Sequence, residues 1–273
     1  MNEIFIAVIL GIVEGLTEFL PVSSTGHLIV VGHWLQFTGE KANIFEIFIQ
    51  LGAIIAVLIY FRARIWRLVS LILGKSVPDS ELTIAQARRF GLSVILAFIP
   101  AAIFGFLLHD KIEELLFNPK TVAAALIVGG VGIIAIEQLH LRIKTDAMEK
   151  ITWGQALGIG FAQCLSLIPG MSRSASTIMG GMVLGLNHAA AAEFSFFLAI
   201  PTIFAATVYS LLKRIDLLNA DDVTVFAVGF IVSLLVAWLV IAAFMSFIKK
   251  HSFEAFGWYR IALGFVILGM MFF

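Results

Sequence analysis

The sequence predicts an all-α integral membrane protein with six transmembrane helices and two re-entrant helical hairpins, which together form an inverted-topology repeat. Composition is the first reason, because 60% of the 273 residues are hydrophobic and only 13% are charged. A soluble domain carries nearly twice that charge. The second reason is that several apolar runs approach the roughly 20 residues that a helix needs to cross a bilayer. The third is that two apolar regions are interrupted by polar residues and resemble each other.

The same composition argues against several other classes. The formal net charge is zero, so nothing indicates nucleic acid as a partner. Cys164 is the only cysteine, so an intrachain disulfide framework is excluded. The first residues lack a basic start and include acidic side chains, unlike a cleaved signal peptide. We therefore expect residues 1–273 to form a single membrane domain.

Six uninterrupted apolar segments account for the predicted spans. Pro119 precedes the third segment and Asp222 precedes the fifth, as is typical of helix starts. In chain order the segments are residues 44–61, 90–108, 122–136, 190–212, 223–248 and 257–273.

The two interrupted regions, residues 4–37 and 153–186, predict the re-entrant hairpins. The first is broken at PVSSTGH (21–27) and the second at PGMSRS (169–174). Each region therefore holds two apolar pieces of about half the usual span length, which is typical of helices that enter the membrane and return. The two hairpins would contain four short helices. Non-helical backbone at that depth is tolerated only where protein or water surrounds it.

A constant offset of 149 residues relates the two regions. It places Ser23 on Ser172 and matches further residues in the hairpins and in the spans that follow them. We infer two repeats, about 1–138 and about 150–273, each with one hairpin followed by three spans. Because three is an odd number, the second repeat must be inverted in the membrane.

The distribution of Lys and Arg predicts the orientation. Residues 62–89 hold six basic side chains against Asp79 and Glu81, which makes this segment cytoplasmic by the positive-inside rule. Alternation of the spans then puts residues 139–152 and 248–256 in the cytoplasm and both termini outside. The first hairpin enters from the outer face and the second from the cytoplasm, so their tips can meet inside the membrane.

The first tip carries two carboxylates, Glu14 and Glu18. Their spacing puts both on one face of a helix. There they can hold a divalent cation, or one can act as a base beside it. The simpler alternative is that both face water near a helix end. Intramembrane carboxylates are costly and usually functional, which favours a site.

Three hydroxyls and a histidine follow the carboxylates: Ser23, Ser24, Thr25 and His27. Each hydroxyl alone is explained as a helix N-cap, and a lone histidine is more often structural, but the cluster indicates a site. If a helix restarts here, Ser24 and His27 share one face. His27 would then take the proton of a Ser24 nucleophile. His27 itself and metal-activated water are the other sensible nucleophiles.

The second tip, PGMSRSAST (169–177), has the chemistry of an anion site. Arg173 is a planar donor fork suited to phosphate oxygens, and Ser172 and Ser174 add donors. A helix that begins near Ser174 aims free N–H groups and its positive dipole end at the same point. The alternative is that Arg173 only neutralises a buried carboxylate of the first tip.

An anion site beside two carboxylates predicts a phosphate ester or pyrophosphate as substrate, with a bridging metal. Its depth in the membrane indicates that the other end of the substrate is a lipid. EGLTEFLPVSSTGH (14–27) and PGMSRSAST (169–177) resemble the two signatures of the undecaprenyl-pyrophosphate phosphatase family of the bacitracin-resistance type. FEIFIQLGAIIAV (45–57) and EFSFFLAIP (193–201) are also similar to that family.

The resemblance implies removal of the terminal phosphate of undecaprenyl pyrophosphate, which recycles the lipid carrier for cell-wall polysaccharide synthesis and confers bacitracin resistance. It implies a multi-pass protein of the bacterial inner membrane, dependent on magnesium or calcium, with its active site open to the outer face. The catalytic residues that it implies are Glu14, Glu18, Ser24, His27 and Arg173. The helper residues are Ser23, Thr25, Ser172, Ser174 and Thr177.

A secondary transporter or lipid flippase is the rival prediction, because inverted repeats with broken helices are a transporter architecture. A transporter needs only binding groups, whereas this chain has a candidate nucleophile and bases beside an anion clamp. The expected partners are the polyprenyl pyrophosphate substrate and membrane lipid. The assembly state is open, with a homodimer as one possibility.

Overall fold

The computed structural model describes residues 2–78, 80–116, 118–139, 141–214 and 222–271. Within these ranges the regular elements are helices, apart from one isolated bridge between Thr145 and Leu186. The α-helices are α1 (Glu3–Thr17), α2 (Ser24–Trp34), α3 (Glu40–Tyr60), α4 (Arg62–Ile72), α5 (Ile84–Leu116), α6 (Pro119–Gln138), α7 (Trp153–Gln163), α8 (Arg173–Val183), α9 (His188–Arg214), α10 (Asp222–Phe247) and α11 (Glu254–Met270). Two short 3₁₀ helices are η1 (Met148–Lys150) and η2 (Cys164–Leu167).

Five helices of the described chain are long and apolar enough to cross a membrane. They are α3, the first part of α5 (Ile84–Leu108), α6, α9 as far as Lys213, and α10. The sixth predicted span corresponds to α11, which is shorter at 17 residues; residues 272–273 of that prediction lie outside the described residues. The all-helical membrane class is therefore confirmed, and the six-span arrangement with re-entrant hairpins stays a prediction.

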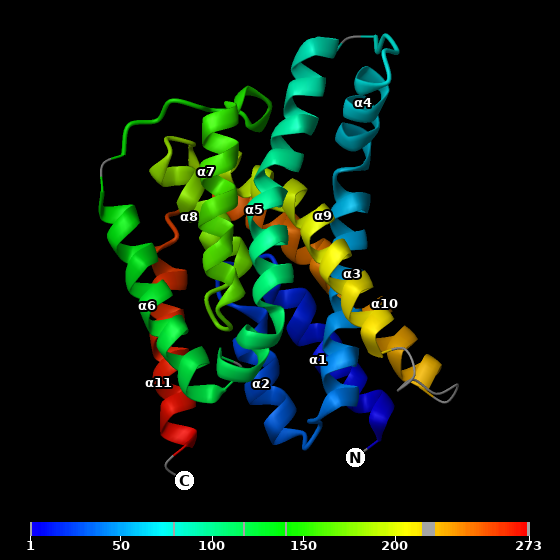
Figure 1. The fold of residues 1–273 in the computed structure, drawn as a ribbon, viewed down its shortest axis with the longest axis vertical. Coiled ribbons are helices and arrows are strands. Elements are labelled where there is room, and N and C mark those ends of the chain that lie inside the picture. The colour runs from blue at the N-terminus through cyan, green and yellow to red at the C-terminus, as the bar shows by residue number, and fades with distance from the viewer. Residues whose placement is uncertain (1, 79, 117, 140, 215–221, 272–273) are drawn as a thin grey trace.

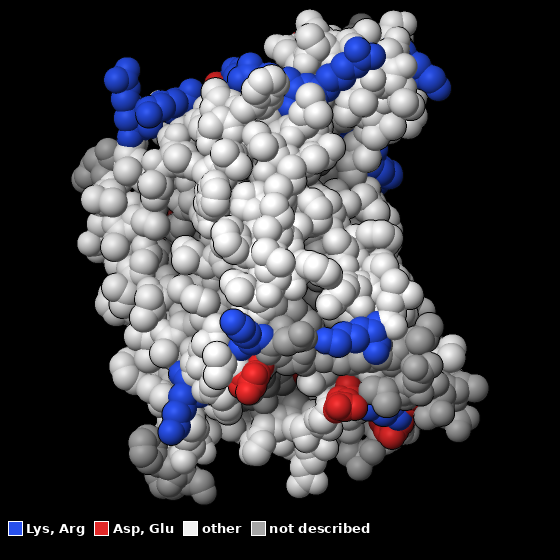
Figure 2. Space-filling model, in the orientation of Figure 1, with Lys and Arg blue, Asp and Glu red and all other residues white. Residues whose placement is uncertain are grey.

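On the visible face, a broad band with few charged side chains separates two charged ends (Figure 2). On the visible face, Lys and Arg dominate the end that carries α4, whereas both signs of charge occur at the opposite end. The start of α1 and the end of α11 lie together at that opposite end (Figure 1). Many large hydrophobic side chains of the long helices are exposed, including Ile95, Phe106 and Leu239, as contact with lipid tails requires.

The two interrupted regions fold alike at their tips. Ser23 and Ser172 occupy the left-handed region with φ of 71° and 70°, which is uncommon for a residue with a Cβ atom. Each is the N-cap of the helix that follows: Ser23 Oγ accepts from the Gly26 amide at 3.4 Å and Ser172 Oγ from the Ala175 amide at 3.2 Å. Helices α2 and α8 each begin directly after a serine with this strained backbone. Their first residues, Ser24 and Arg173, are 149 positions apart.

The first helix of each interrupted region packs against a long helix from the other half of the chain. Helix α1 runs along α10, and α7 runs along α5. Glycines allow these close approaches: a Cβ on Gly11 would lie 2.7 Å from Gly229 O, and one on Gly160 would lie 2.5 Å from Ala97 O. Gly11 and Gly160 are also 149 residues apart. The two halves therefore interlock, and the tips lie inside the fold.

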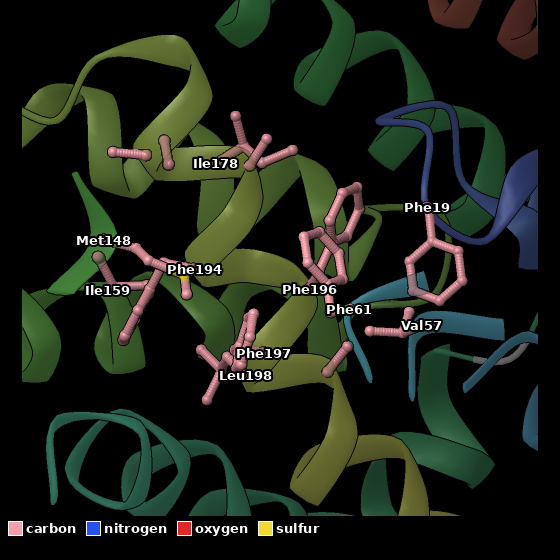
Figure 3. Packing of buried hydrophobic residues seen from close by; sticks show 14 of the residues in the cluster. Phe19, Val57, Phe61, Met148, Ile159, Ile178, Phe194, Phe196, Phe197 and Leu198 are labelled. Atoms are coloured by element: carbon pink, nitrogen blue, oxygen red, sulfur yellow. The ribbon is translucent and has the colours of Figure 1, made fainter. Parts of the chain in front are cut away.

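Aromatic packing fixes the first tip in the core. Phe19, next to Glu18, is fully buried, and its ring meets that of Phe196 edge to face at a centroid distance of 5.3 Å. Figure 3 shows Phe19 beside Phe61, which directly follows α3, and Phe196, which lies within α9. Because aromatic pairs of this kind have a preferred geometry, they hold the backbone of the tip at a defined position relative to α9.

Candidate active site

The tips of the two interrupted regions meet. Arg173 Nη2 donates to Glu18 Oε1 at 3.1 Å, and both side chains are about nine-tenths buried. A second link joins the tips through the backbone, because Ser174 Oγ donates to Leu20 O at 2.8 Å. The prediction that the carboxylates of one tip face the arginine of the other is confirmed for Glu18.

Glu18 connects a hydroxyl to the guanidinium. Its other carboxylate oxygen, Oε2, accepts a hydrogen bond from Ser24 Oγ at 2.7 Å. Glu18 follows the last residue of α1, and Ser24 is the first residue of α2, so the short turn between the helices brings them together. A carboxylate that accepts from a serine hydroxyl is arranged as a general base for that hydroxyl.

Arg173 is held by groups from α8 and α9. Its Nη1 donates to Ser195 O at 3.0 Å and to Ser195 Oγ at 3.2 Å. Thr177 Oγ1 in turn donates to Ser195 Oγ at 2.7 Å, and the guanidinium carbon lies 5.7 Å from the centroid of the Phe19 ring. Arg173 Nε is buried without a hydrogen-bond partner among the described residues. One donor of the fork therefore has no partner among the described residues.

A cavity of about 650 Å³ begins at these residues. Its floor is formed by the two tips, and its walls come from α3, α5 and α9. Asn43, Ile112 and Ser210 also line it, near the start of α3 and near the ends of α5 and α9. The start of α3 and the end of α5 lie toward the side of the molecule where α1 begins (Figure 1). The walls are largely apolar, with residues such as Phe98, Ala101, Ile203 and Ala206. A polar floor beneath apolar walls suits a ligand with an anionic head and a hydrocarbon tail.

The predicted helper residues divide into two groups. Ser23, Ser24, Thr25 and Ser172 line the cavity. Ser174 and Thr177 do not: both are fully buried, and they bond to Leu20 O and to Ser195 Oγ. In this structure their hydroxyls hold the two tips together and fix the arginine, so their part in phosphate binding stays a prediction.

His27 is placed differently from the prediction. Its Nδ1 lies 2.7 Å from Ser23 O, and its Nε2 lies 2.7 Å from the Tyr259 hydroxyl, whose ring stacks on the imidazole. His27 is not among the residues that line the cavity. The expected hydrogen bond between Ser24 and His27 is absent, because Ser24 bonds to Glu18 and both ring nitrogens of His27 are engaged elsewhere.

Glu14 lies behind Glu18 and is fully buried. Neither of its carboxylate oxygens has a hydrogen-bond partner among the described residues, and the charges that act on it include those of Glu18, Glu46 and Arg173. A buried carboxylate without donors is costly, so this side chain fits a role as ligand of a cation. The described residues contain no cluster of three or more His, Cys, Asp or Glu with metal-binding geometry.

Three cavity residues on α3 were not among the predicted site residues. Asn43, Glu46 and Gln50 line one wall, and their spacing of three and four residues puts them on one helix face. That polar stripe within an apolar span was a usable signal. Ser195 and Arg260 were also missed, and their roles depend on contacts across the fold.

The sequence matches the family described as "Bacitracin resistance protein BacA" over residues 7–266. It is 54% identical over 265 residues to the protein named undecaprenyl-diphosphatase of Ectopseudomonas mendocina, covering 97% of this chain and 92% of that relative. The undecaprenyl-diphosphatase of Aromatoleum aromaticum is 49% identical over 263 residues, with 96% and 93% covered. Undecaprenyl-diphosphatase 1 of Chromobacterium violaceum is 49% identical over 267 residues, with 97% and 96% covered. Because both the family match and these identities extend over nearly the whole sequence, the chain belongs to the bacitracin resistance protein BacA family.

Proposed function

We propose that this chain hydrolyses undecaprenyl pyrophosphate to undecaprenyl phosphate and inorganic phosphate. This reaction recycles the lipid carrier for cell-wall polysaccharide synthesis and confers bacitracin resistance. The observation that carries the proposal is the chain of contacts from Ser24 through Glu18 to Arg173 at the floor of a largely apolar cavity. Relatives that are about half identical along nearly their whole length bear the name of this activity.

The second tip binds the terminal phosphate. Arg173 lines the cavity, and its guanidinium binds oxygens of the terminal phosphate, as a planar fork does. Ser172 and the cavity-facing hydroxyls of the first tip add donors. The hydrocarbon tail follows the apolar walls between α5 and α9.

The hydrolysis then takes place in two displacements. Ser24 Oγ attacks the terminal phosphorus while Glu18 accepts its proton, the anhydride P–O bond breaks, and the bridging oxygen leaves with undecaprenyl phosphate. Water then attacks the phosphoserine, which releases inorganic phosphate and restores the Ser24 hydroxyl. The contact of 2.7 Å between Ser24 Oγ and Glu18 Oε2 favours Ser24 over His27 as nucleophile.

A divalent cation, magnesium or calcium, is part of the proposal. Glu14 and Glu18 would hold it, because Glu14 offers two carboxylate oxygens that no described residue satisfies. The diphosphate and water would complete its shell, as is usual for magnesium. When bound, it would neutralise charge on the diphosphate.

We also propose the membrane arrangement. The basic end with α4 faces the cytoplasm of a bacterial inner membrane, by the positive-inside rule, and both termini lie outside. The two interrupted regions are re-entrant hairpins of an inverted repeat, and six helices span the bilayer. The part of the cavity lined by Asn43 and Ile112 then points to the outer face, from which the pyrophosphate head of the lipid reaches the site.

Phosphate release by the purified protein from undecaprenyl pyrophosphate tests the proposed function. We expect release with the wild type, loss with Ser24→Ala, and full activity with Ser246→Ala, an exposed serine on α10. Chelator should stop the reaction and added magnesium should restore it. Lipid movement across vesicles without any phosphate release would instead favour a flippase and contradict the proposal.

A further inference from the structure

A second arginine lies at the same two tips but outside the cavity. Arg260 belongs to α11, and its large side chain is fully buried. It is not among the residues that line the cavity. A charged side chain at membrane depth is costly and usually has a function, yet the proposed chemistry makes no use of Arg260.

The Arg260 guanidinium bonds to both tips at once. Its Nη1 donates to Pro21 O at 3.3 Å, in the turn of the first tip, and its Nη2 donates to Gly170 O at 3.0 Å, in the turn of the second. Pro21 lies midway between Glu18 and Ser24, and Gly170 precedes Arg173 by three residues. One rigid group therefore connects the backbone that carries the nucleophile and base with the backbone that carries the anion clamp.

The same guanidinium is anchored on α6. Its Nη2 also donates to Ala125 O at 3.2 Å, and its Nε donates to Leu126 O at 3.5 Å. Among the described residues, the hydrogen-bond acceptors of Arg260 are these four carbonyls, and no carboxylate pairs with it. A planar guanidinium has five donors in a fixed geometry, so it can link four carbonyls in a way that lysine or an apolar side chain cannot.

Glycines on α6 and α11 make room for this arrangement. The two helices pack along each other, and a Cβ on Gly130 would lie 2.6 Å from Gly257 O. A Cβ on Gly129 would overlap the Arg260 guanidinium. The close packing of α6 and α11 therefore places the guanidinium of Arg260 at the two tips. Substitution of Gly129 can displace that guanidinium without changing Arg260 itself.

We propose that Arg260 is a positioning residue, which sets the separation between the Ser24–Glu18 pair and Arg173 by tying Pro21 and Gly170 to one rigid group. It touches neither substrate nor metal. The proposal rests on the proposed function, because it assigns Arg260 to the geometry of that site. A buried cation that bonds only to carbonyls contributes defined geometry more than net stability, and reaction rates are sensitive to displacements of about 1 Å.

Steady-state kinetics provide the first test. In Arg260→Met the maximal rate should fall roughly ten- to a hundredfold, the loss expected from displacing reacting groups, while KM changes less than about threefold, since Arg260 does not bind substrate. Gly129→Ala should change the rate in the same direction, and Arg260→Lys should lie between wild type and Arg260→Met. The matched control is Arg67→Met, an exposed arginine on α4, which should keep the wild-type rate. A folded Arg260→Met protein with a lower melting temperature but the wild-type kcat would overturn the proposal.

A distance measurement provides a test that does not depend on activity. Leu16 and Leu165 are exposed residues beside the two tips, so nitroxide labels at Leu16→Cys and Leu165→Cys, in a Cys164→Ala background, report their separation by pulsed electron paramagnetic resonance. We expect the distance distribution to broaden or shift in Gly129→Ala and Arg260→Met and to stay unchanged in Arg67→Met. Unchanged distributions in both variants would contradict the positioning role.

The two tests also separate this proposal from the proposed function. If the wild type releases no phosphate but the label distances change as expected, the proposed function fails while Arg260 still positions the tips. If the wild type is active and neither the rate nor the distances respond, only the positioning role fails. If Arg260→Met does not fold, both the kinetics and the label distances are measured on Gly129→Ala and Arg260→Lys instead.

Discussion

Ser24 donates its hydroxyl hydrogen bond to Glu18, with 2.7 Å between Ser24 Oγ and Glu18 Oε2, and not to His27. Glu18 at the same time accepts from Arg173 of the other tip. A single carboxylate therefore lies between the candidate nucleophile and the candidate phosphate clamp, and this relationship determines the first predictions.

Ser24 and Glu18 should behave as one catalytic unit. We expect Ser24→Ala and Glu18→Gln each to lower kcat by roughly 10²–10⁴-fold, because the hydroxyl is a poor nucleophile without its base. The double variant should be little worse than either single variant. Rate measurements on the four proteins of this cycle check the prediction, and penalties that simply add would show that the two groups act independently.

His27 should act through Tyr259 and the backbone of the first tip. Tyr259→Phe removes one hydrogen bond to the imidazole and keeps the ring stack, so we expect a loss of about 1 kcal/mol, roughly fivefold, in rate or stability. Adding it to His27→Ala should have little further effect, since both changes break the same contact. Kinetics and thermal unfolding of the three variants measure these effects, and a loss of kcat in His27→Ala as large as that in Ser24→Ala would indicate instead that His27 is the base for Ser24.

Arg173→Lys should not be a conservative change. Lysine keeps the charge but loses the planar fork that bonds Glu18 and Ser195 together. Loss of one charge-assisted bond to the phosphate costs about 1.5–3 kcal/mol, or roughly ten- to a hundredfold in rate. Arg67→Lys on the exposed face of α4 is the control. Activity within twofold of wild type would mean that Arg173 only neutralises Glu18.

Activity should depend on a divalent cation through Glu14. Glu14→Gln removes the negative charge while keeping the shape of the side chain. It should raise the magnesium concentration for half-maximal activity at least tenfold, a change that is typical even for residues that only support a metal ligand. Titration of chelated protein with magnesium measures this shift. Full activity in excess chelator would exclude the metal and leave both glutamates as bases.

Adding a single methyl group where the two halves of the chain pack together should destabilise the protein. Gly160→Ala would push a Cβ atom against Ala97 O of α5, and overpacking of this kind typically destabilises by about 1–3 kcal/mol. Gly154 lies on the same helix, and a Cβ atom there would meet nothing within 4 Å, so Gly154→Ala is the matched control. Thermal unfolding in detergent should show a lower midpoint for Gly160→Ala only.

Much of the site could be predicted from sequence because polar residues in apolar surroundings stand out. Glu18 and Arg173 were identified in this way, and the offset between Ser23 and Ser172 pointed to two similar tips. The backbone of both serines indeed adopts the same left-handed conformation. Composition, apolar length and local breaks are properties of short segments, so they can be read without knowledge of the fold.

Sequence-based prediction fails where a side chain has more than one possible hydrogen-bond partner. Ser24 and His27 have a spacing that permits contact on a helix, yet Ser24 is the first residue of α2 and reaches back to Glu18 instead. Side chains on a helix lean toward its N-terminus, which favours that choice. Arg260 was missed because its acceptors lie 90 to 239 residues away in sequence, and no local pattern reports such contacts.

The central claim is that both tips bind the same diphosphate. An experimental structure of the Ser24→Ala protein with a methylene-bridged diphosphonate analogue of the lipid tests it most directly. We predict that the terminal phosphonate contacts Arg173 of the second tip and the hydroxyls of the first tip, with the tail between α5 and α9. An analogue bound to one tip alone, with the pair between Glu18 and Arg173 left intact, would contradict the account.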